Sequence, residues 1–249
     1  MTFKDHFSRD SSAYKTHRPQ YDVSLVDHLA AGLDVRKLAV DVGCGSGQFT
    51  RVLAKRFDRV IAYDGSASQI ENADPDDRVD YRVGTAENIQ LDPLSVDMIT
   101  VVQAAHWFDL PAFYACADKA LKPGGVLALV AYGLARITPE IDAAVDDFYT
   151  RGIGAYWPPE RAHFDDEYAS LPFPYDEPPM PRYELKVDWT FDQLKGYLGT
   201  WSAIGEAKKV LGFNPLDAFA AKLQEVWGDA ESRTVCWPLF MRYGRKPLV

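Results

Sequence analysis

The chain is poor in cysteine, has no long apolar run and carries more acidic than basic residues. Its three cysteines, Cys44, Cys116 and Cys236, lie far apart without a C-x-x-C pair or a Cys/His cluster. Neither a disulfide framework nor a metal site is therefore predicted, and all three are expected to be free thiols. No segment approaches the roughly 20 apolar residues of a membrane span, and the first residues lack the apolar stretch of a signal peptide. We expect a cytoplasmic protein with no membrane partner.

The charge balance argues against a nucleic-acid partner. The chain has 27 basic and 36 acidic residues, a formal net charge of -9 and a pI near 5.0. This excess of negative charge would repel a phosphate backbone. A length of 249 residues with 47% hydrophobic side chains suits one domain with elaborations. No internal repeat or low-complexity tract divides the chain.

Short apolar runs bounded by Gly or Asp alternate with helical patterns over much of the chain. Runs rich in Val, Ile and Leu are typical of buried parallel strands. Strands are expected at 37–43, 59–64, 79–84, 97–103, 125–133, 183–190 and 234–243. Helical patterns cover 22–33, 48–57, 66–72, 111–121, 191–198 and 214–227. The alternation predicts an α/β fold with a doubly wound sheet.

We expect a single domain in four parts. Residues 1–34 would form an N-terminal helical cap, and residues 35–133 the ligand-binding core. Residues 134–182 are rich in proline and aromatic side chains without clear periodicity, and we expect an insertion over the substrate site. Residues 183–249 would complete the sheet. Pro238 cannot donate to a strand ladder, so it predicts a bulge or a later start for the last strand.

A glycine-rich turn is the strongest local signal in the sequence. Gly43, Gly45 and Gly47 follow Asp41 where a buried strand ends and a helix begins. Glycines there allow a tight turn and let a ligand approach the backbone N–H groups. A plain tight turn is the alternative. Nicotinamide enzymes favour G-x-G-x-x-G, whereas this chain has Gln48 at the position of the third glycine.

An acidic residue follows at the end of the next strand. Asp64 comes 21 residues after Gly43, where nucleotide-binding folds place a carboxylate on the ribose hydroxyls. Asp64, Gly65 and Ser66 could instead cap the following helix. The spacing favours a ligand that contains ribose.

These features make the sequence similar to the class I S-adenosylmethionine-dependent methyltransferases (methyltransferase type 11). The likeness rests on the Asp41–Gly47 turn, Asp64, the Gly84–Glu87 segment (GTAE) and the strand at 97–103, and it spans most of the chain. It implies a Rossmann-like, mostly parallel seven-stranded sheet with an antiparallel last strand. It also implies S-adenosylmethionine as the cofactor and S-adenosylhomocysteine as the product.

Three segments resemble one branch of that family, which contains the trans-aconitate methyltransferases. They are residues 14–21 (YKTHRPQY), 104–109 (AAHWFD) and 154–157 (GAYW). The match to this branch says little about the identity of the methyl acceptor.

The resemblance implies a set of cofactor contacts. They are Tyr14, Arg18, Gly43, Cys44, Gly45, Asp64, Gly65, Ser66, Ala86, Glu87, Gln103 and Ala104. The glycine turn and residues 103–104 would face the methionine part, Asp64 the ribose and residues 86–87 the adenine. Tyr14 and Arg18 would close over the methionine part, and Arg18 would pair with its carboxylate.

The acceptor site is expected just past the fourth strand, where an open α/β sheet places its ligand crevice. Its expected residues are His106, Trp107, Tyr132, Tyr156 and Trp157. His106 could act as a general base or only as a structural hydrogen-bonding group. Trp107 could face the sulfonium or pack in the core. Three arginines could pair with an acidic acceptor, namely Arg136, Arg151 and Arg161.

The predicted reaction is methyl transfer to a small molecule on a carboxylate oxygen. A carboxylate is already ionised and needs no base, whereas a phenol, amine or carbon acceptor would need one. The sequence contains no unambiguous base. The alternatives are a non-catalytic sensor or scaffold that binds S-adenosylmethionine, and a nicotinamide-dependent oxidoreductase. The sequence leaves the oligomeric state open.

Overall fold

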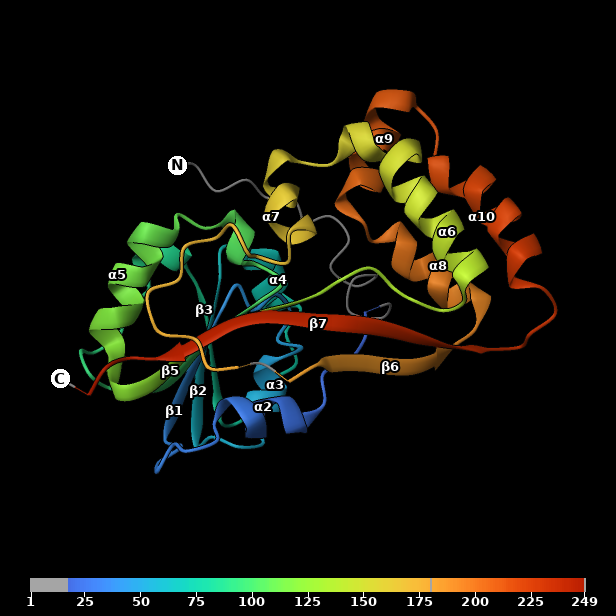
Figure 1. The fold of residues 1–249 in the computed structure, drawn as a ribbon. Coiled ribbons are helices and arrows are strands. Elements are labelled where there is room, and N and C mark those ends of the chain that lie inside the picture. Colours follow the sequence, from blue (N-terminus) through green and yellow to red (C-terminus); the bar gives the residue numbers. More distant parts are fainter. Residues whose placement is uncertain (1–17, 180, 249) are drawn as a thin grey trace.

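The computed structural model describes residues 18–179 and 181–248, and its centre is a seven-stranded sheet in the order β3-β2-β1-β4-β5-β7-β6 (Figure 1). The strands are β1 (Leu38–Val42), β2 (Arg59–Asp64), β3 (Val79–Val83), β4 (Val96–Val102), β5 (Leu121–Tyr132), β6 (Tyr183–Trp189) and β7 (Arg233–Arg245). β7 is antiparallel to both of its neighbours, and the pairs among the first five strands are parallel. The predicted doubly wound, mostly parallel sheet with an antiparallel last strand is confirmed.

Helices cover both faces of the sheet because alternate strand residues are apolar on each face. On one face α2 (Val23–Leu29) and α3 (Thr50–Leu53) pack against strand residues such as Met98 and Val130. On the other face α5 (Leu110–Ala120) packs against Ile99 and Leu129. The strand order reverses between β1 and β4, and an α/β sheet of this kind forms a ligand crevice at the carboxyl ends of the strands there.

Two sequence predictions about the strands need correction, one for β5 and one for β7. β5 begins at Leu121 rather than at 125, because Leu121 pairs with Val96 before a shift in register carries the chain through the glycine turn. The bulge or later start predicted from Pro238 is wrong. β7 pairs with β6 without a break through Glu184 and Pro238. Pro238 lies just past the end of the ladder between β5 and β7, which ends at the pair Tyr132 and Leu239. Its missing N–H is therefore not needed by β5, and its carbonyl accepts the N–H of Gly133.

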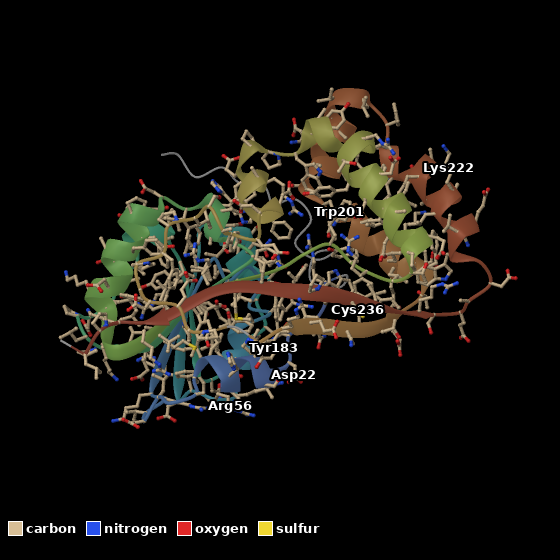
Figure 2. The ribbon with its side chains drawn as sticks, in the orientation of Figure 1. Asp22, Arg56, Tyr183, Trp201, Lys222 and Cys236 are labelled. Carbon is tan, nitrogen blue, oxygen red and sulfur yellow. The ribbon has the colours of Figure 1, made fainter. Side chains whose placement is uncertain are left out.

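A helical lobe stands beyond the carboxyl end of β5 and consists of α6 (Pro139–Asp147), α8 (Phe191–Gly199), α9 (Ser202–Leu211) and α10 (Pro215–Trp227) (Figure 1). Trp201 lies on the inner side of this lobe and Lys222 on the outer side of α10 (Figure 2). Its apolar side chains join the core formed by β6, β7 and α2. The lobe therefore extends one hydrophobic core over the end of the sheet.

Shorter elements connect the lobe to the sheet. The insertion contains a π-helical segment at Phe148–Gly152, 3₁₀ turns at Gly154–Tyr156 and Pro159–Arg161, and α7 (Ala162–Asp165). After β2, β3 and β4, respectively, come α4 (Ala67–Glu71) and 3₁₀ turns at Ala86–Asn88 and Ala105–Trp107. In the described part of the chain, no helix has both the length and the apolar character that a membrane crossing demands.

Candidate active site

The glycine turn follows β1 in the position expected from the sequence. Gly43, Gly45 and Gly47 have φ angles of +72°, +55° and +82°, a backbone region that L side chains rarely adopt. The N–H groups of Gly43 and Cys44 both donate to the carbonyl of Tyr63 in β2. The turn is therefore fixed to the end of the neighbouring strand.

The three glycines differ in what surrounds them. A Cβ on Gly43 would lie 2.6 Å from the Cβ of Ala104, and one on Gly47 would overlap the phenol of Tyr81. Among the described residues, a Cβ on Gly45 would meet nothing closer than 3.8 Å. Gly43 and Gly47 thus serve close packing, whereas Gly45 borders space that the described residues leave open to a ligand.

Asp64 connects the end of β2 to the glycine turn. Its Oδ2 accepts the backbone N–H of Gly45 and its Oδ1 accepts that of Ser66, both at 2.8 Å. The N-cap of α4 is Ser66, whose hydroxyl accepts the N–H of Gln69 at 3.4 Å. The Asp64 carboxylate therefore joins the glycine turn to the start of α4.

Asp41 and Cys44 are buried beneath the turn. Burial raises the pKa of Asp41 to about 6, and the nearby charge of Asp64 adds to the rise. The hydroxyls of Thr50 and Thr100 donate to its two oxygens at 2.7 and 2.9 Å. Burial also raises the pKa of the Cys44 thiol well above its usual value. The negative charges of Asp41 and Asp64 raise this pKa further. Cys44 is therefore a packed thiol under the turn.

Ala86 and Glu87 lie in the 3₁₀ turn after β3. Ala86 is buried, and a carboxylate oxygen of Glu87 accepts the backbone N–H of Asp109 at 3.0 Å. Asp109 is the N-cap residue of α5. The Glu87 side chain thus joins this turn to the start of α5.

Gln103 and Ala104 come directly after β4. Gln103 has a φ of +61°, which is unusual for a residue with a side chain. Its backbone N–H donates to Val130, and its buried Nε2 has no hydrogen-bond partner within the described residues. A buried amide donor without a partner costs free energy unless a ligand accepts its hydrogen bond.

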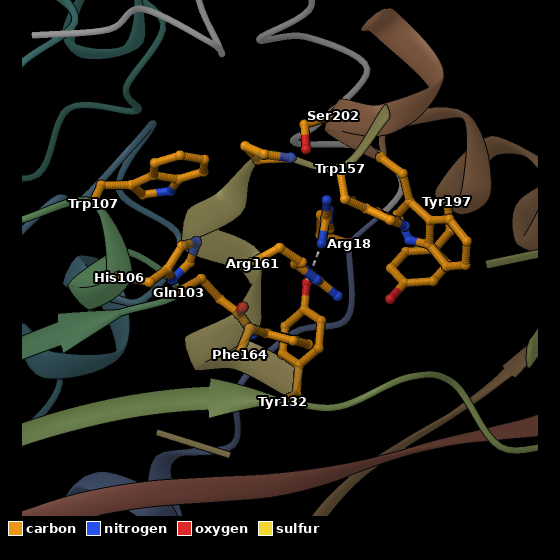
Figure 3. A pocket seen from close by; sticks show the side chains of 12 residues that line it. Arg18, Gln103, His106, Trp107, Tyr132, Trp157, Arg161, Phe164, Tyr197 and Ser202 are labelled. Atoms are coloured by element: carbon orange, nitrogen blue, oxygen red, sulfur yellow. Dashed lines mark hydrogen bonds between the residues drawn. The ribbon is translucent and has the colours of Figure 1, made fainter. Parts of the chain in front are cut away.

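A cavity opens between the carboxyl ends of β4 and β5, the insertion and the helical lobe (Figure 3). It is lined by Arg18, Gln103, His106, Trp107, Tyr132, Trp157, Pro158, Arg161, Phe164, Tyr197, Trp201 and Ser202. The lining is mostly aromatic. It includes two guanidinium groups, and none of these described lining residues is acidic.

His106 is held in place beside Trp107. It is buried, and its Nδ1 lies 2.9 Å from the hydroxyl of Tyr168. The rings of His106 and Trp107 are 4.7 Å apart. Burial lowers the pKa of His106 to about 3, and the positive charges of Arg161 and His163 lower it further. The imidazole is consequently neutral near pH 7.

Arg18 reaches the same cavity from the segment that precedes α2. Its Nη1 donates to the hydroxyl of Tyr132 at 2.8 Å, and its guanidinium lies 5.2 Å from the ring centre of Tyr197 (Figure 3). Tyr14, the other residue expected from this segment, lies outside the described residues.

The structure brings His106, Trp107, Tyr132 and Trp157 of the expected acceptor residues to one cavity. Tyr156 is partly buried against the core and is not among the residues that line it. Sequence reasoning missed the contributions of the lobe, which are Tyr197, Trp201 and Ser202. It also missed Tyr168. The only sequence feature that pointed to these segments was their many aromatic residues. Aromatic residues are equally typical of core packing, so this feature did not identify the site.

Comparison with known proteins agrees with this geometry. A family model described as a methyltransferase domain matches residues 40–129. A methyltransferase-family protein of Dictyostelium discoideum is 37% identical over 98% of this chain and 96% of its own. A solved structure of a methyltransferase-family protein from Anaeromyxobacter dehalogenans is 43% identical, with a TM-score of 0.85 over 92% of this chain and 99% of that chain.

A more distant neighbour has the cofactor bound. A phosphoethanolamine N-methyltransferase of Haemonchus contortus, solved with S-adenosylmethionine, shares the fold at 19% identity. Its TM-score is 0.51, over 99% of this chain and 60% of that chain. The strand order, the glycine turn and the long matches over nearly the whole chain agree with one another. The chain therefore belongs to the class I S-adenosylmethionine-dependent methyltransferases.

Proposed function

We propose that this methyltransferase acts on a small organic acid and methylates a carboxylate oxygen. The observation that carries the proposal is the cavity beyond β4 and β5, which has two arginines, many aromatic rings and no acidic residue among its described lining. Such a lining favours an anion with an apolar body. The likeness of residues 104–109 and 154–157 to the trans-aconitate branch supports the same class of acceptor.

The glycine turn and the ends of β2 and β4 would hold the cofactor. Asp64 would accept the ribose hydroxyls, and the open space at Gly45 leaves room for a ligand against the backbone. The unpartnered Nε2 of Gln103 would donate to the methionine part, where Arg18 would pair with the carboxylate. Cys44, Gly65, Ser66, Ala86, Glu87 and Ala104 would complete this site. The orphaned amide and the open glycine fit S-adenosylmethionine.

The protein would contribute to this reaction mainly by positioning the acceptor and the cofactor. When bound, S-adenosylmethionine supplies an electrophilic methyl group on a sulfonium. Holding a nucleophile in line with such a group can lower the activation barrier by roughly 7 to 11 kcal/mol. Walls made by Trp107, Trp157 and Phe164 would exclude water from the acceptor. These residues need only orient a nucleophile that is already ionised.

The state of His106 favours a carboxylate over a phenol or an amine. A general base works best with a pKa near the operating pH, and burial keeps that of His106 at about 3. A neutral imidazole held by Tyr168 is suited to orienting an acceptor oxygen. A carboxylate acceptor needs no proton removed, so this arrangement is sufficient for it.

The decisive experiment is a methyl-donor consumption assay with a panel of acceptors. The purified protein is incubated with S-adenosylmethionine and succinate, glutarate, itaconate or aconitate, and with phenols and amines of similar size. We expect S-adenosylhomocysteine to form only with the acids. The methyl product should release methanol in mild base, as esters do. Transfer only to a phenol or an amine would contradict the proposal.

The same assay tests the alternative of a non-catalytic binding protein. A protein that binds S-adenosylmethionine in calorimetry but turns over with no acceptor would favour a sensor or scaffold. The cytoplasmic location and the absence of a nucleic-acid partner stay predictions from the sequence.

A further inference from the structure

The three arginines that the sequence offered for an acidic acceptor lie in different surroundings. Both oxygens of Asp146 accept from Nη1 of Arg136, at 2.8 and 2.9 Å. Arg151 pairs with Asp147, and its side chain is 83% exposed. Arg161 has a side chain only 18% exposed, and it lines the cavity. Arg161 alone of these three reaches the site.

The guanidinium of Arg161 is oriented by its own neighbours. Its Nε donates to the hydroxyl of Tyr149 at 2.7 Å, and that hydroxyl donates to Asp165 at 2.5 Å. Its Cζ lies 3.6 Å from the ring centre of Phe164 and 4.6 Å from that of Trp157. Aromatic rings and one hydrogen bond thus fix the plane of the group before any ligand binds.

The terminal nitrogens of Arg161 are left for a ligand. Within the described residues, neither Nη1 nor Nη2 donates a hydrogen bond to a protein acceptor. Asp165 is 3.7 Å from Nε and half exposed, so it screens the charge only in part. Two parallel N–H groups with a fixed plane match a carboxylate in a bidentate pair.

A cation paired with the reacting carboxylate would slow the methyl transfer. The carboxylate loses its negative charge as the methyl bond forms and the bond to sulfur breaks, because the products are a neutral ester and a neutral thioether. Pairing with Arg161 would stabilise the ionised ground state more than the transition state. Arg161 is therefore better suited to an anionic group that does not react.

We propose that Arg161 selects the acceptor by binding a second, non-reacting carboxylate, so that the preferred substrate is a dicarboxylate or a larger polyacid. This inference rests on the proposed function only in assuming that the group that is methylated is a carboxylate. The reacting carboxylate would lie toward Gln103 and His106, and the second carboxylate would lie against Arg161 under Trp157 and Phe164. Arg18 stays with the methionine carboxylate.

The test compares each diacid with its half-amide, succinamate or glutaramate, in which one carboxylate is neutral. Wild-type enzyme should prefer the diacid by at least about tenfold in kcat/KM. Arg161→Gln should lose about that factor on the diacid, mostly through KM, and little on the half-amide. Arg151→Gln is the matched control and should behave as wild type. Equal losses on both acceptors, or an unchanged preference, would overturn the proposal.

Binding is measured separately from turnover. Calorimetry with succinate or glutarate is performed on the complex with S-adenosylhomocysteine, for the wild type and for Arg161→Gln. The variant should bind the diacid roughly tenfold more weakly and keep its affinity for S-adenosylhomocysteine. If this holds while no acid is methylated, the proposed function fails and the role of Arg161 stands. If no diacid binds the wild type, or both proteins bind it equally, the role of Arg161 is wrong.

Discussion

The imidazole Nδ1 of His106 lies 2.9 Å from the hydroxyl of Tyr168, and both side chains are buried. Tyr168 and the preceding Glu167 have φ angles of +64° and +57°. Consecutive side-chain-bearing residues in this region of backbone space are costly, and such strain often accompanies function. The chain accepts this cost at the place where the Tyr168 hydroxyl meets His106.

Replacing His106 with Gln should therefore change acceptor binding more than the chemical step. A neutral imidazole with a pKa of about 3 removes few protons at neutral pH, and a carboxylate acceptor carries none to remove. We expect the single-turnover rate to fall by less than about tenfold, and kcat to show no titration of His106 between about pH 5 and 8.

Tyr168→Phe is the companion variant. Its ring should still pack against Phe240, whose centre is 5.2 Å away, while the hydrogen bond to His106 is lost. Its effect should have the same direction as that of His106→Gln and be smaller. A single-turnover rate reduced by roughly 10² to 10⁴ in His106→Gln, with acceptor affinity intact, would make His106 a general base. The acceptor would then be a hydroxyl, an amine or an acidic carbon.

Asp64→Ala should weaken S-adenosylmethionine binding at least about tenfold. The change removes up to two hydrogen bonds to ribose hydroxyls, each worth roughly 1.5 to 3 kcal/mol when the acceptor is charged. It also removes the acceptor for the N–H of Gly45, so the glycine turn loses a support. Calorimetry measures the affinity, and the melting temperature shows whether the fold is kept. Unchanged affinity would rule out the ribose assignment.

The glycines of the turn offer a matched pair of substitutions. Gly43→Ala and Gly45→Ala both place a methyl group on a backbone with positive φ, at a cost of about 1 kcal/mol or more each. Gly43→Ala adds a contact at 2.6 Å with the Cβ of Ala104, which lies between the end of β4 and the 3₁₀ turn at Ala105–Trp107. We expect urea denaturation to show the larger loss of stability for Gly43→Ala.

Gly45→Ala should keep more of the fold and lose cofactor affinity instead. Its Cβ enters the open space beside Asp64 rather than the protein interior. If Gly45→Ala binds S-adenosylmethionine as well as the wild type does, the open space at Gly45 is not part of the cofactor site.

The central sheet was predictable because the start and end of each strand are visible in the local sequence. β1 and β2 are short, mostly apolar runs that end in Val42 and Asp64, and the expected ranges agree with the structure within one or two residues. Parallel strands buried on both faces leave this pattern whatever surrounds them. The glycine turn was equally visible, because its three positive φ angles require glycine locally.

The helical lobe was only partly predictable. α6 buries only Ile141 and Val145, and α9 buries Ile204 with two small residues, so the apolar period is weak. Start and stop signals were nevertheless present. The hydroxyl of Thr138 accepts the N–H of Ile141 ahead of α6, and Gly212 ends α9 with a φ of +77°.

The details of the acceptor site depend on contacts between distant parts of the chain. Tyr168 and His106 are 62 residues apart, and no local pattern joins them. The choice of Arg161 over Arg136 likewise rests on which side chain lines the cavity in the folded protein. Sequence supplied the residue types, and tertiary packing decided among them.

Asp41 gives the fold a dependence on pH that can be isolated. In the unfolded chain its pKa is the ordinary 3.8, whereas burial raises the folded pKa to about 6. Below about pH 4 the residue is protonated in both states. As pH rises from about 4 to 6 the unfolded state releases the proton first, so the free energy of unfolding decreases. The decrease reaches at most about 3 kcal/mol above the folded pKa, because one pKa unit corresponds to about 1.4 kcal/mol.

Asp41→Asn should abolish that slope, because the amide does not ionise. Urea denaturation of both proteins from about pH 4 to 7.5 gives the difference in unfolding free energy, which cancels groups that titrate alike in both. This difference should shift in favour of the variant as pH rises through the window. Asp64→Asn removes the nearby charge that helps raise the pKa of Asp41, so it should move the upper end of the window to lower pH. A difference between wild type and Asp41→Asn that is independent of pH would mean that Asp41 is ionised in the folded protein throughout.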